Sequence, residues 1–429
     1  MALPPKPCPP QPLGHPIGSN GIDGMPMSIH PKPAPLPAGT LPRGVLSETP
    51  SPQQRQAWHA VRRLLAVRLD NLGDVMMTTP ALRAIRTSLP GTHITLLASP
   101  GAAGLKPYLA DVDDVIAYAA PWMKASAPSH ALDTVGMIRR LQAGRFDAAV
   151  IFTSFSQSPL PAAQLCQLAD IGLRLAHCHE NPYQLLTDWI ADPEPQHAVR
   201  HEVQRQLDLV AAIGCRTADT RLRFTLDAAS RAAALTRLQI LGLDSCSPRP
   251  WLVLHPGASA PSRRYPAERW AVLGDELVAR LNCTLLWTGN GEEAALIQRI
   301  RTGMRKPGTT LANELNLGEF AALLAAAPVL ITNNSGPVHL AAALGTPIVD
   351  LYALTNPQHT PWGTPHKLLF HPVACGFCYR SVCPELHHGC LRNIAPRSVV
   401  DATVALLATG RGLPAESRQS DVCTATQKP

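Results

Sequence analysis

The stretch VRRLLAVRLDNLGDVMMTTPALRAIRTSLPGTHITLLA, residues 61–98, decides the fold of this 429-residue chain. Its first nine residues predict a buried strand, residues 70–73 a tight turn, and residues 74–89 a helix that stops before Pro90. A second strand is predicted over residues 93–98. Because a strand, a helix and a strand in this order form a right-handed βαβ unit, we expect a parallel sheet.

The same alternation returns later in the chain. A further strand is predicted over residues 146–152, whereas residues 224–250 carry no strand pattern and end in a linker-like SCSPRP segment. We therefore predict an α/β protein with two Rossmann-like doubly wound parallel-sheet domains facing a cleft, over residues 57–240 and 241–411. In the second domain, strands are predicted over residues 251–254, 284–287, 329–331 and 347–351, and helices over residues 268–281, 292–300, 320–327 and 339–344.

Composition bounds these domains and narrows the classes of function. Of the 43 prolines, 15 lie within the first 52 residues, so we predict a Pro-rich disordered leader over residues 1–56. Residues 412–429 are predicted to be a disordered tail. The net charge of +7 allows an anionic partner, but no run of five basic residues indicates nucleic-acid binding.

Targeting signals are not evident in the sequence. The start of the chain has no apolar stretch typical of a signal peptide, and the nearly apolar residues 320–331 are too few to cross a bilayer. We therefore expect a cytoplasmic protein that can bind peripherally to the inner face of the membrane. In that compartment the 11 cysteines are expected to be thiols or metal ligands rather than disulfides.

Asp74 is the first candidate for a catalytic role. It follows the first predicted strand and the glycine turn, so it lies at the start of a helix on the ligand-binding edge of the sheet. One interpretation is a helix N-cap, and the other is a general base that accepts a proton from an attacking hydroxyl. The turn is not GxGxxG, and no P-loop is present, so the usual phosphate cradles of dinucleotide oxidoreductases and NTPases are missing.

A second strand-turn-helix junction lies at Thr332-Asn-Asn-Ser-Gly-Pro-Val-His339. Ser335 and Gly336 would present backbone N–H groups to an anion at the start of a helix. His339 could donate to a phosphate oxygen, or it could be a histidine of the core. The small residues of the following helix favour a diphosphate site.

Two more loops in the second domain have the same character. In His255-Pro-Gly-Ala-Ser259, Gly257 would let the backbone of Ser259 approach a ligand, and the downstream Arg263 and Arg264 could neutralise phosphate or be solvated. In the loop that begins at Gly289, a carboxylate could bind ribose hydroxyls or simply lie in the first turn of a helix. The carboxylates of that loop are Glu292 and Glu293.

Four cysteines, Cys375, Cys378, Cys383 and Cys390, are closely spaced near the C-terminus. The spacing would suit four thiolates on one zinc ion, but the second C-x2-C of common zinc ribbons is missing. The alternative is a thiol-rich loop held by packing. We assign no metal-binding residue.

Over residues 65–407 the chain resembles glycosyltransferase family 9, the lipopolysaccharide heptosyltransferases. The last motif, with its cysteines, is similar to the C-terminus of heptosyltransferase II-type members. The motifs that carry the resemblance are Leu-Gly-Asp74 followed by Met-Met-Thr-Thr-Pro80, His255-Pro-Gly-Ala-Ser259, Asn334-Ser-Gly-Pro-Val-His-Leu340, Gly345-Thr-Pro347, Thr355-Asn-Pro-Gln-His-Thr-Pro-Trp362 and Cys375 to Cys390.

The resemblance implies a GT-B fold and inverting, metal-independent transfer without a cofactor from a nucleotide-diphosphate sugar. The donor in the family is commonly ADP-heptose, and the acceptor is the lipopolysaccharide core. The catalytic aspartate of the family falls on Asp74, and the basic residue at the diphosphate falls on Arg263. Donor-phosphate contacts fall on Asn334, Ser335 and Gly336, with Asn334 in place of the commoner aspartate, and the acidic nucleoside contact falls on Glu292 or Glu293.

Three alternatives remain open. The chain could transfer a different nucleotide sugar, it could be a nucleotide-sugar epimerase, or it could bind a nucleotide sugar without catalysis. The first two share the two-domain fold with the main interpretation. The third is favoured by Asn334 and opposed by the intact Asp74 and both arginines.

Overall fold

The computed structural model describes residues 52–123, 130–195, 199–243 and 250–410. Helix α1 (Pro52–His59) begins within the range predicted as a disordered leader, so that prediction extends too far. Trp58 is the reason, because its side chain is buried and its indole N–H donates to Asp188 at 3.1 Å. The rest of the predicted leader and the predicted tail lie outside the described residues.

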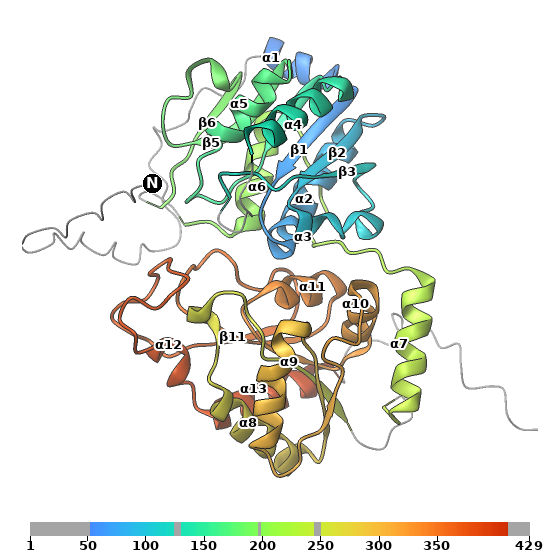
Figure 1. Ribbon diagram of the computed structural model, residues 1–429, viewed down its shortest axis with the longest axis vertical. Helices are drawn as coiled ribbons and strands as arrows, with labels where there is room; N and C mark the ends of the chain where they lie inside the picture. Colours follow the sequence, from blue (N-terminus) through green and yellow to red (C-terminus); the bar gives the residue numbers. More distant parts are fainter. Residues whose placement is uncertain (1–51, 124–129, 196–198, 244–249, 411–429) are drawn as a thin grey trace, which may run out of the picture. The chain divides into compact units, whose positions relative to one another are not determined.

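The first sheet contains six parallel strands in the order β3-β2-β1-β4-β5-β6 (Figure 1). This is the strand order of a Rossmann domain, whose crevice lies between the first and fourth strands. The strands are β1 (Arg63–Arg68), β2 (His93–Ala98), β3 (Asp114–Ala117), β4 (Ala148–Ile151), β5 (Leu173–Cys178) and β6 (Asp188–Ala191).

Helices cover both faces of this sheet because successive strand residues point to opposite sides. Leu64 of β1 contributes to an apolar cluster with helices α2 (Leu72–Ser88) and α6 (Glu202–Ala212). Leu65 points to the other face, towards α4 (Ala131–Gly144) and α5 (Leu160–Leu168). The short helix α3 (Pro100–Ala103) follows β2. We call this sheet and its helices the first domain.

The second sheet repeats the pattern, with six parallel strands in the order β12-β11-β10-β7-β8-β9. Counted from β7, this is again the Rossmann order. The strands are β7 (Trp251–His255), β8 (Thr284–Trp287), β9 (Thr309–Thr310), β10 (Leu330–Asn333), β11 (Ile348–Leu351) and β12 (His366–Leu369). We call this sheet and its helices the second domain.

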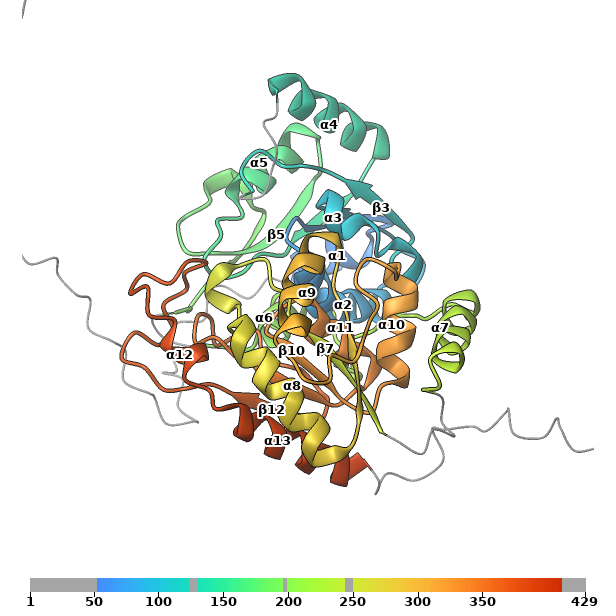
Figure 2. The same cartoon turned by 60° about the horizontal axis from the view of Figure 1, so that its bottom comes forward.

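One face of the second sheet packs against α8 (Ala267–Leu281), α9 (Ala294–Thr302) and α13 (Pro396–Gly410) (Figure 2). The other face packs against α10 (Leu317–Ala326) and α11 (Gly336–Leu344). These two helices share one apolar cluster with α2 and α6, so a continuous core joins the two domains. The short helix α12 (Gly389–Arg392) precedes α13.

Helix α7 (Ala228–Ile240) occupies part of the region without a strand pattern. It falls within the range predicted for the N-terminal domain, yet it packs along α10, and Arg237 pairs with Glu314 at 2.6 Å. The linker-like residues 245–249 lie outside the described residues. The domain boundary at residues 240/241 stays a prediction.

Candidate active site

The candidate base, Asp74, lies at the start of α2, directly after β1. Asn71 is the N-cap of this helix, so the N-cap interpretation of Asp74 is wrong, and Asp74 is instead the third helical residue. Its carboxylate is 3.4 Å from the guanidinium of Arg68, and its side chain is 19% exposed. The carboxylate is therefore held by a cation and remains open to a ligand.

Arg68, the last residue of β1, is completely buried. Its guanidinium lies 2.8 Å from Asp70 and 2.8 Å from Glu202, the first residue of α6. Burial alone would lower the pKa of Arg68, but Asp70, Glu202 and Asp74 raise it above its usual value. Arg68 therefore stays charged at every physiological pH.

The starts of α2 and α11 meet at Gly73. A β-carbon added to Gly73 would lie only 2.8 Å from Cδ2 of His339, and one added to Gly336 would lie 3.9 Å from Leu72. Glycine is required at residue 73 because a larger residue would collide with the imidazole. The structure therefore brings the neighbour of Asp74 into contact with the predicted diphosphate turn.

We expect Gly73→Ala to lower the free energy of unfolding by about 1–3 kcal/mol, because the methyl group would overpack this contact. Gly136→Ala in α4 is the matched control, since nothing lies within 4 Å of its added β-carbon. In a helix that substitution should instead stabilise the protein by about 0.5–1 kcal/mol. Denaturant unfolding of both variants checks the prediction, and equal changes would contradict it.

His339 is buried, with 4% of its surface exposed. Burial is the main cause that lowers the pKa of His339 well below its usual value, so the imidazole is neutral near pH 7. Its Nδ1 atom has no hydrogen-bond partner among the described residues. His339 is packed like a core residue, which fits the interpretation as a histidine of the core. Its Nδ1 atom is nevertheless unused beside the candidate site, so the interpretation as a phosphate donor also stays open.

In the turn before α11, the side chains of Ser335 and Asn334 make hydrogen bonds within the protein. Ser335 is the N-cap, and its hydroxyl donates to the backbone oxygens of Gly257 at 3.3 Å and Asn333 at 3.2 Å. The first N–H groups of a helix lack intrahelical partners, which leaves this turn suited to an anion. Asn334 is buried, and its amide donates to Asp350 and to the backbone oxygen of His359, both at 2.9 Å. The Asn334 amide hydrogens are therefore committed within the protein.

Asp350, the partner of Asn334, should make stability depend on pH. Burial raises the pKa of Asp350 to about 7, from 3.8. The folded state then holds this proton more tightly than the unfolded state, so stability falls as pH rises between these values. We expect Asp350→Asn to remove that loss, which amounts to about 1.4 kcal/mol for each unit of pKa shift. Unfolding of both proteins at pH 5, 6, 7 and 8 tests this, and parallel pH curves would disprove it.

The two predicted arginines differ in their surroundings. Arg264 braces its own loop, because its guanidinium donates to the backbone oxygens of Ala258 at 2.7 Å and Ser259 at 3.3 Å. Arg263 is half-buried, and within the described part of the chain its guanidinium makes no hydrogen bond or ion pair. Its charge acts on His339 and Asp350, so it lies near the α11 turn. Arg263 is the arginine that is free to bind a phosphate.

Of the two predicted acidic contacts, Glu293 is the one directed inwards. Its carboxylate accepts from the backbone N–H of Asn290 at 2.9 Å and lies 3.5 Å from Nε2 of His255. It also packs against Gly257, where an added β-carbon would overlap it, and against Gly289. Glu292 is exposed. The structure thus joins the loops at residues 257 and 289 through Glu293.

The four C-terminal cysteines form no disulfide in the described ranges. Cys375, Cys378 and Cys383 act electrostatically on Cys390, so the four thiols lie near one another. Within the described residues, no three histidine, cysteine, aspartate or glutamate side chains are placed to hold one metal ion. The imidazole of His387 lies 3.6 Å from the Cys375 sulfur. The zinc site and the packed thiol-rich loop both stay predictions.

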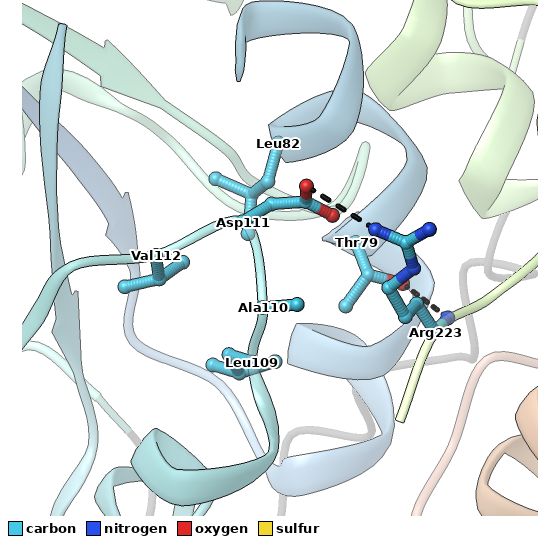
Figure 3. Close-up of a pocket in the computed structure, with 7 residues that line it drawn as sticks. All are labelled: Thr79, Leu82, Leu109, Ala110, Asp111, Val112 and Arg223. Carbon is cyan, nitrogen blue, oxygen red and sulfur yellow. Dashed lines mark hydrogen bonds and ion pairs between the residues drawn. The ribbon is translucent and has the colours of Figure 1, made fainter. Parts of the chain in front are cut away.

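A small pocket lies between α2 and the segment Leu109–Val112 (Figure 3). Arg223 lines it and is already used, since its backbone N–H donates to Thr79 and its guanidinium lies 3.5 Å from Asp111. None of the predicted site residues lines this pocket.

Sequence reasoning missed three residues that the structure places beside the candidate site: Arg68, Glu202 and His359. Glu202 is buried and lies 3.8 Å from Nε2 of His359. A charged residue at the end of an apolar strand was the available signal for Arg68, because a buried arginine requires carboxylate partners. No signal pointed to Glu202, whereas His359 lies in the motif Thr355 to Trp362 that carries the resemblance, although no role was assigned to it there.

The chain is similar to proteins of known name over most of its length. Lipopolysaccharide heptosyltransferase 2 of Escherichia coli is 30% identical over 167 residues, which cover 38% of this chain and 48% of that protein. Lipopolysaccharide heptosyltransferase 2 of Salmonella typhimurium is 25% identical over 358 residues, which cover 80% of this chain and 98% of that protein. The structure of E. coli ADP-heptose LPS heptosyltransferase II matches with a TM-score of 0.64 and 22% identity, over 82% of this chain and 100% of that chain.

The two Rossmann sheets and this structural likeness define a GT-B protein, as predicted. Residues 135–388, more than half of the chain, match the model of glycosyltransferase family 9 (heptosyltransferase). The chain therefore belongs to glycosyltransferase family 9 and is a glycosyltransferase. Among the described residues, no helix has the length and apolar character needed to cross a membrane.

Proposed function

We propose that this enzyme transfers heptose from ADP-heptose to the lipopolysaccharide core with inversion at the anomeric carbon. One observation carries the proposal: the helix that presents Asp74 contacts the helix whose start forms the predicted diphosphate turn, through Gly73 and His339. In this proposal, a base on one domain acts beside an anion site on the other. Two relatives are named lipopolysaccharide heptosyltransferase 2, and these names support the choice of heptose as the sugar and lipopolysaccharide as the acceptor.

In the proposed reaction, Asp74 accepts the proton of an acceptor hydroxyl as its oxygen bonds to the anomeric carbon. The bond between that carbon and the diphosphate oxygen breaks, and its electron pair leaves with ADP. Attack occurs on the face opposite the leaving group, so the configuration inverts. No covalent intermediate with the enzyme is required.

Charge on the departing ADP requires stabilisation, which is usually the largest single contribution in such sites. We assign this role to the Arg263 guanidinium, to the backbone N–H groups of Ser335 and Gly336, and to His339. The neutral imidazole of His339 can donate one hydrogen bond. Asn334 and Arg264 shape the surrounding turns through their bonds to backbone oxygens.

The nucleoside is proposed to bind where Gly257 and Gly289 flank Glu293. We assign Ser259, from the same loop as Gly257, to this site as well. Both glycines let the carboxylate pack against the backbone, and its oxygens can accept from ribose hydroxyls. Glu292 would at most contact the rim, because it is exposed. The lipid-linked acceptor would be met in the cytoplasm, with peripheral contact at the inner face of the membrane.

Unfolding of the full chain with a panel of ADP-, UDP-, GDP- and CMP-sugars tests the donor. A ligand at a hundred times its dissociation constant adds roughly 2.7 kcal/mol to stability. We expect this increase with ADP-heptose, followed by product formation on lipopolysaccharide that lacks the accepting heptose. Stabilisation by a sugar of another nucleotide alone would overturn the proposed donor, and donor binding without transfer or hydrolysis would favour the non-catalytic alternative.

A further inference from the structure

The guanidinium of Arg68 contacts three carboxylates, which are those of Asp70, Glu202 and the candidate base Asp74. Its Nε atom pairs with Asp70, Nη1 pairs with Glu202, and Nη2 lies near Asp74. The first two contacts are 2.8 Å long, and the contact with Asp74 is 3.4 Å long. Asp70 and Glu202 therefore fix the guanidinium, and the fixed guanidinium in turn orients Asp74.

Glu202 is itself held firmly from both domains. Its Oε1 atom accepts from Gln206 at 2.7 Å, and its backbone N–H donates to the backbone oxygen of Gln358 at 2.9 Å. Burial would raise the pKa of Glu202, but Arg68 and then His359 lower it below its usual range. Glu202 is therefore a permanent anion anchored to the second domain.

We propose that Arg68, fixed by Glu202, is a positioning residue for the general base Asp74. The inference rests on the proposed function, because it assumes that Asp74 accepts the proton. The guanidinium holds the carboxylate at the helix start, in the position from which it can act as a base. The longer contact leaves Asp74 partly exposed and able to face an acceptor.

The charged and titratable groups near Asp74 come from β1 and the turn after it, from α6, from the segment after β11 and from α11. Arg68 is at the end of β1, and Asp70 is in the following turn. Glu202 opens α6, His359 lies after β11, and His339 lies on α11. Arg68 is the only permanent cation in direct contact with Asp74 among the described residues. Its removal should therefore release the carboxylate from the position in which the guanidinium holds it.

Three variants of the full chain test the inference. In Arg68→Gln, kcat should fall at least tenfold while the affinity for ADP changes little, because the unheld carboxylate loses its productive geometry. Arg68→Lys should also lose at least tenfold in kcat, because an ammonium cannot bridge three carboxylates in a fixed geometry. Arg83→Gln is the matched control.

Arg83 is also a buried arginine of this domain, on α2, and it pairs with Asp219 at 2.9 Å and Asp111 at 3.6 Å. Its loss should reduce stability without lowering kcat. An equal loss of kcat in Arg83→Gln, or an unchanged kcat in a folded Arg68→Gln, would overturn the inference. If Arg68→Gln does not fold, Arg68→Gln/Glu202→Gln removes one charge of each sign and should also lower kcat at unchanged ADP affinity.

Asp74→Asn separates this inference from the proposed function. If Asp74→Asn keeps its turnover, the assignment of the base fails, and the inference falls with it. If Asp74→Asn is inactive while a folded Arg68→Gln keeps its kcat, only the positioning role fails.

Discussion

Asp74→Asn is expected to lower kcat by about a hundred- to ten-thousand-fold, the usual contribution of a general base. The amide keeps the size of the side chain but cannot accept the acceptor proton. Binding of ADP should change little, because the predicted diphosphate contacts come from α11 and Arg263. Initial rates with ADP-heptose and calorimetric titration with ADP measure the two effects.

Asp133→Asn is the matched control for this experiment. Asp133 is also an aspartate at the third position of a helix, in α4, where it caps the backbone N–H of His130 at 2.9 Å. Its substitution should cost some stability and leave kcat unchanged. Unchanged turnover in Asp74→Asn would remove the base assignment, and a large loss of ADP affinity in the same variant would show that Asp74 acts in donor binding instead.

Arg263→Gln is expected to weaken ADP binding by about ten- to a hundredfold, since a hydrogen bond to a charged group contributes roughly 1.5–3 kcal/mol. The structure gives this guanidinium no internal partner in the described residues, so its charge is available to the diphosphate. Calorimetry with ADP measures the loss directly, and kcat/KM for the donor should fall with it.

Arg264→Gln serves as the comparison, because the neighbouring guanidinium binds the backbone oxygens of its own loop. Its loss should lower the thermal stability and affect ADP binding less. The reverse order of affinities, with Arg264→Gln the weaker binder, would exchange the roles of the two arginines.

The strands that the sequence revealed are those with uninterrupted apolar runs. Residues 93–98 and 284–287 match β2 and β8 to the residue, because all but the first residue of each strand is buried. The strands β3, β6, β9 and β12 were missed, and all four lie at sheet edges with partly exposed residues. The interior strand β5 was also missed, because Arg174 and His177 interrupt its apolar run. Edge strands carry a weaker hydrophobic pattern because one side remains in contact with solvent.

The sequence predicted only those parts of the candidate site in which a single loop carries the functional residues. Asp74 and the turn at Ser335 follow apolar strands, and their loops end up adjacent because both lie at the carboxyl ends of parallel strands. The pairing of Arg68 with Glu202 spans 134 residues and depends on how α6 packs. The difference between Arg263 and Arg264 depends on side-chain direction, which adjacent positions in a sequence do not reveal.

The bond from the Glu202 amide to the Gln358 oxygen also has a use beyond positioning the base. This single N–H donates from the first domain to the second, so it is shielded from solvent only while residues 202 and 358 stay together. Its hydrogen–deuterium exchange therefore reports how often that junction opens. Comparing the exchange rate with and without ADP would show whether the nucleotide closes the enzyme, even in a variant that cannot turn over.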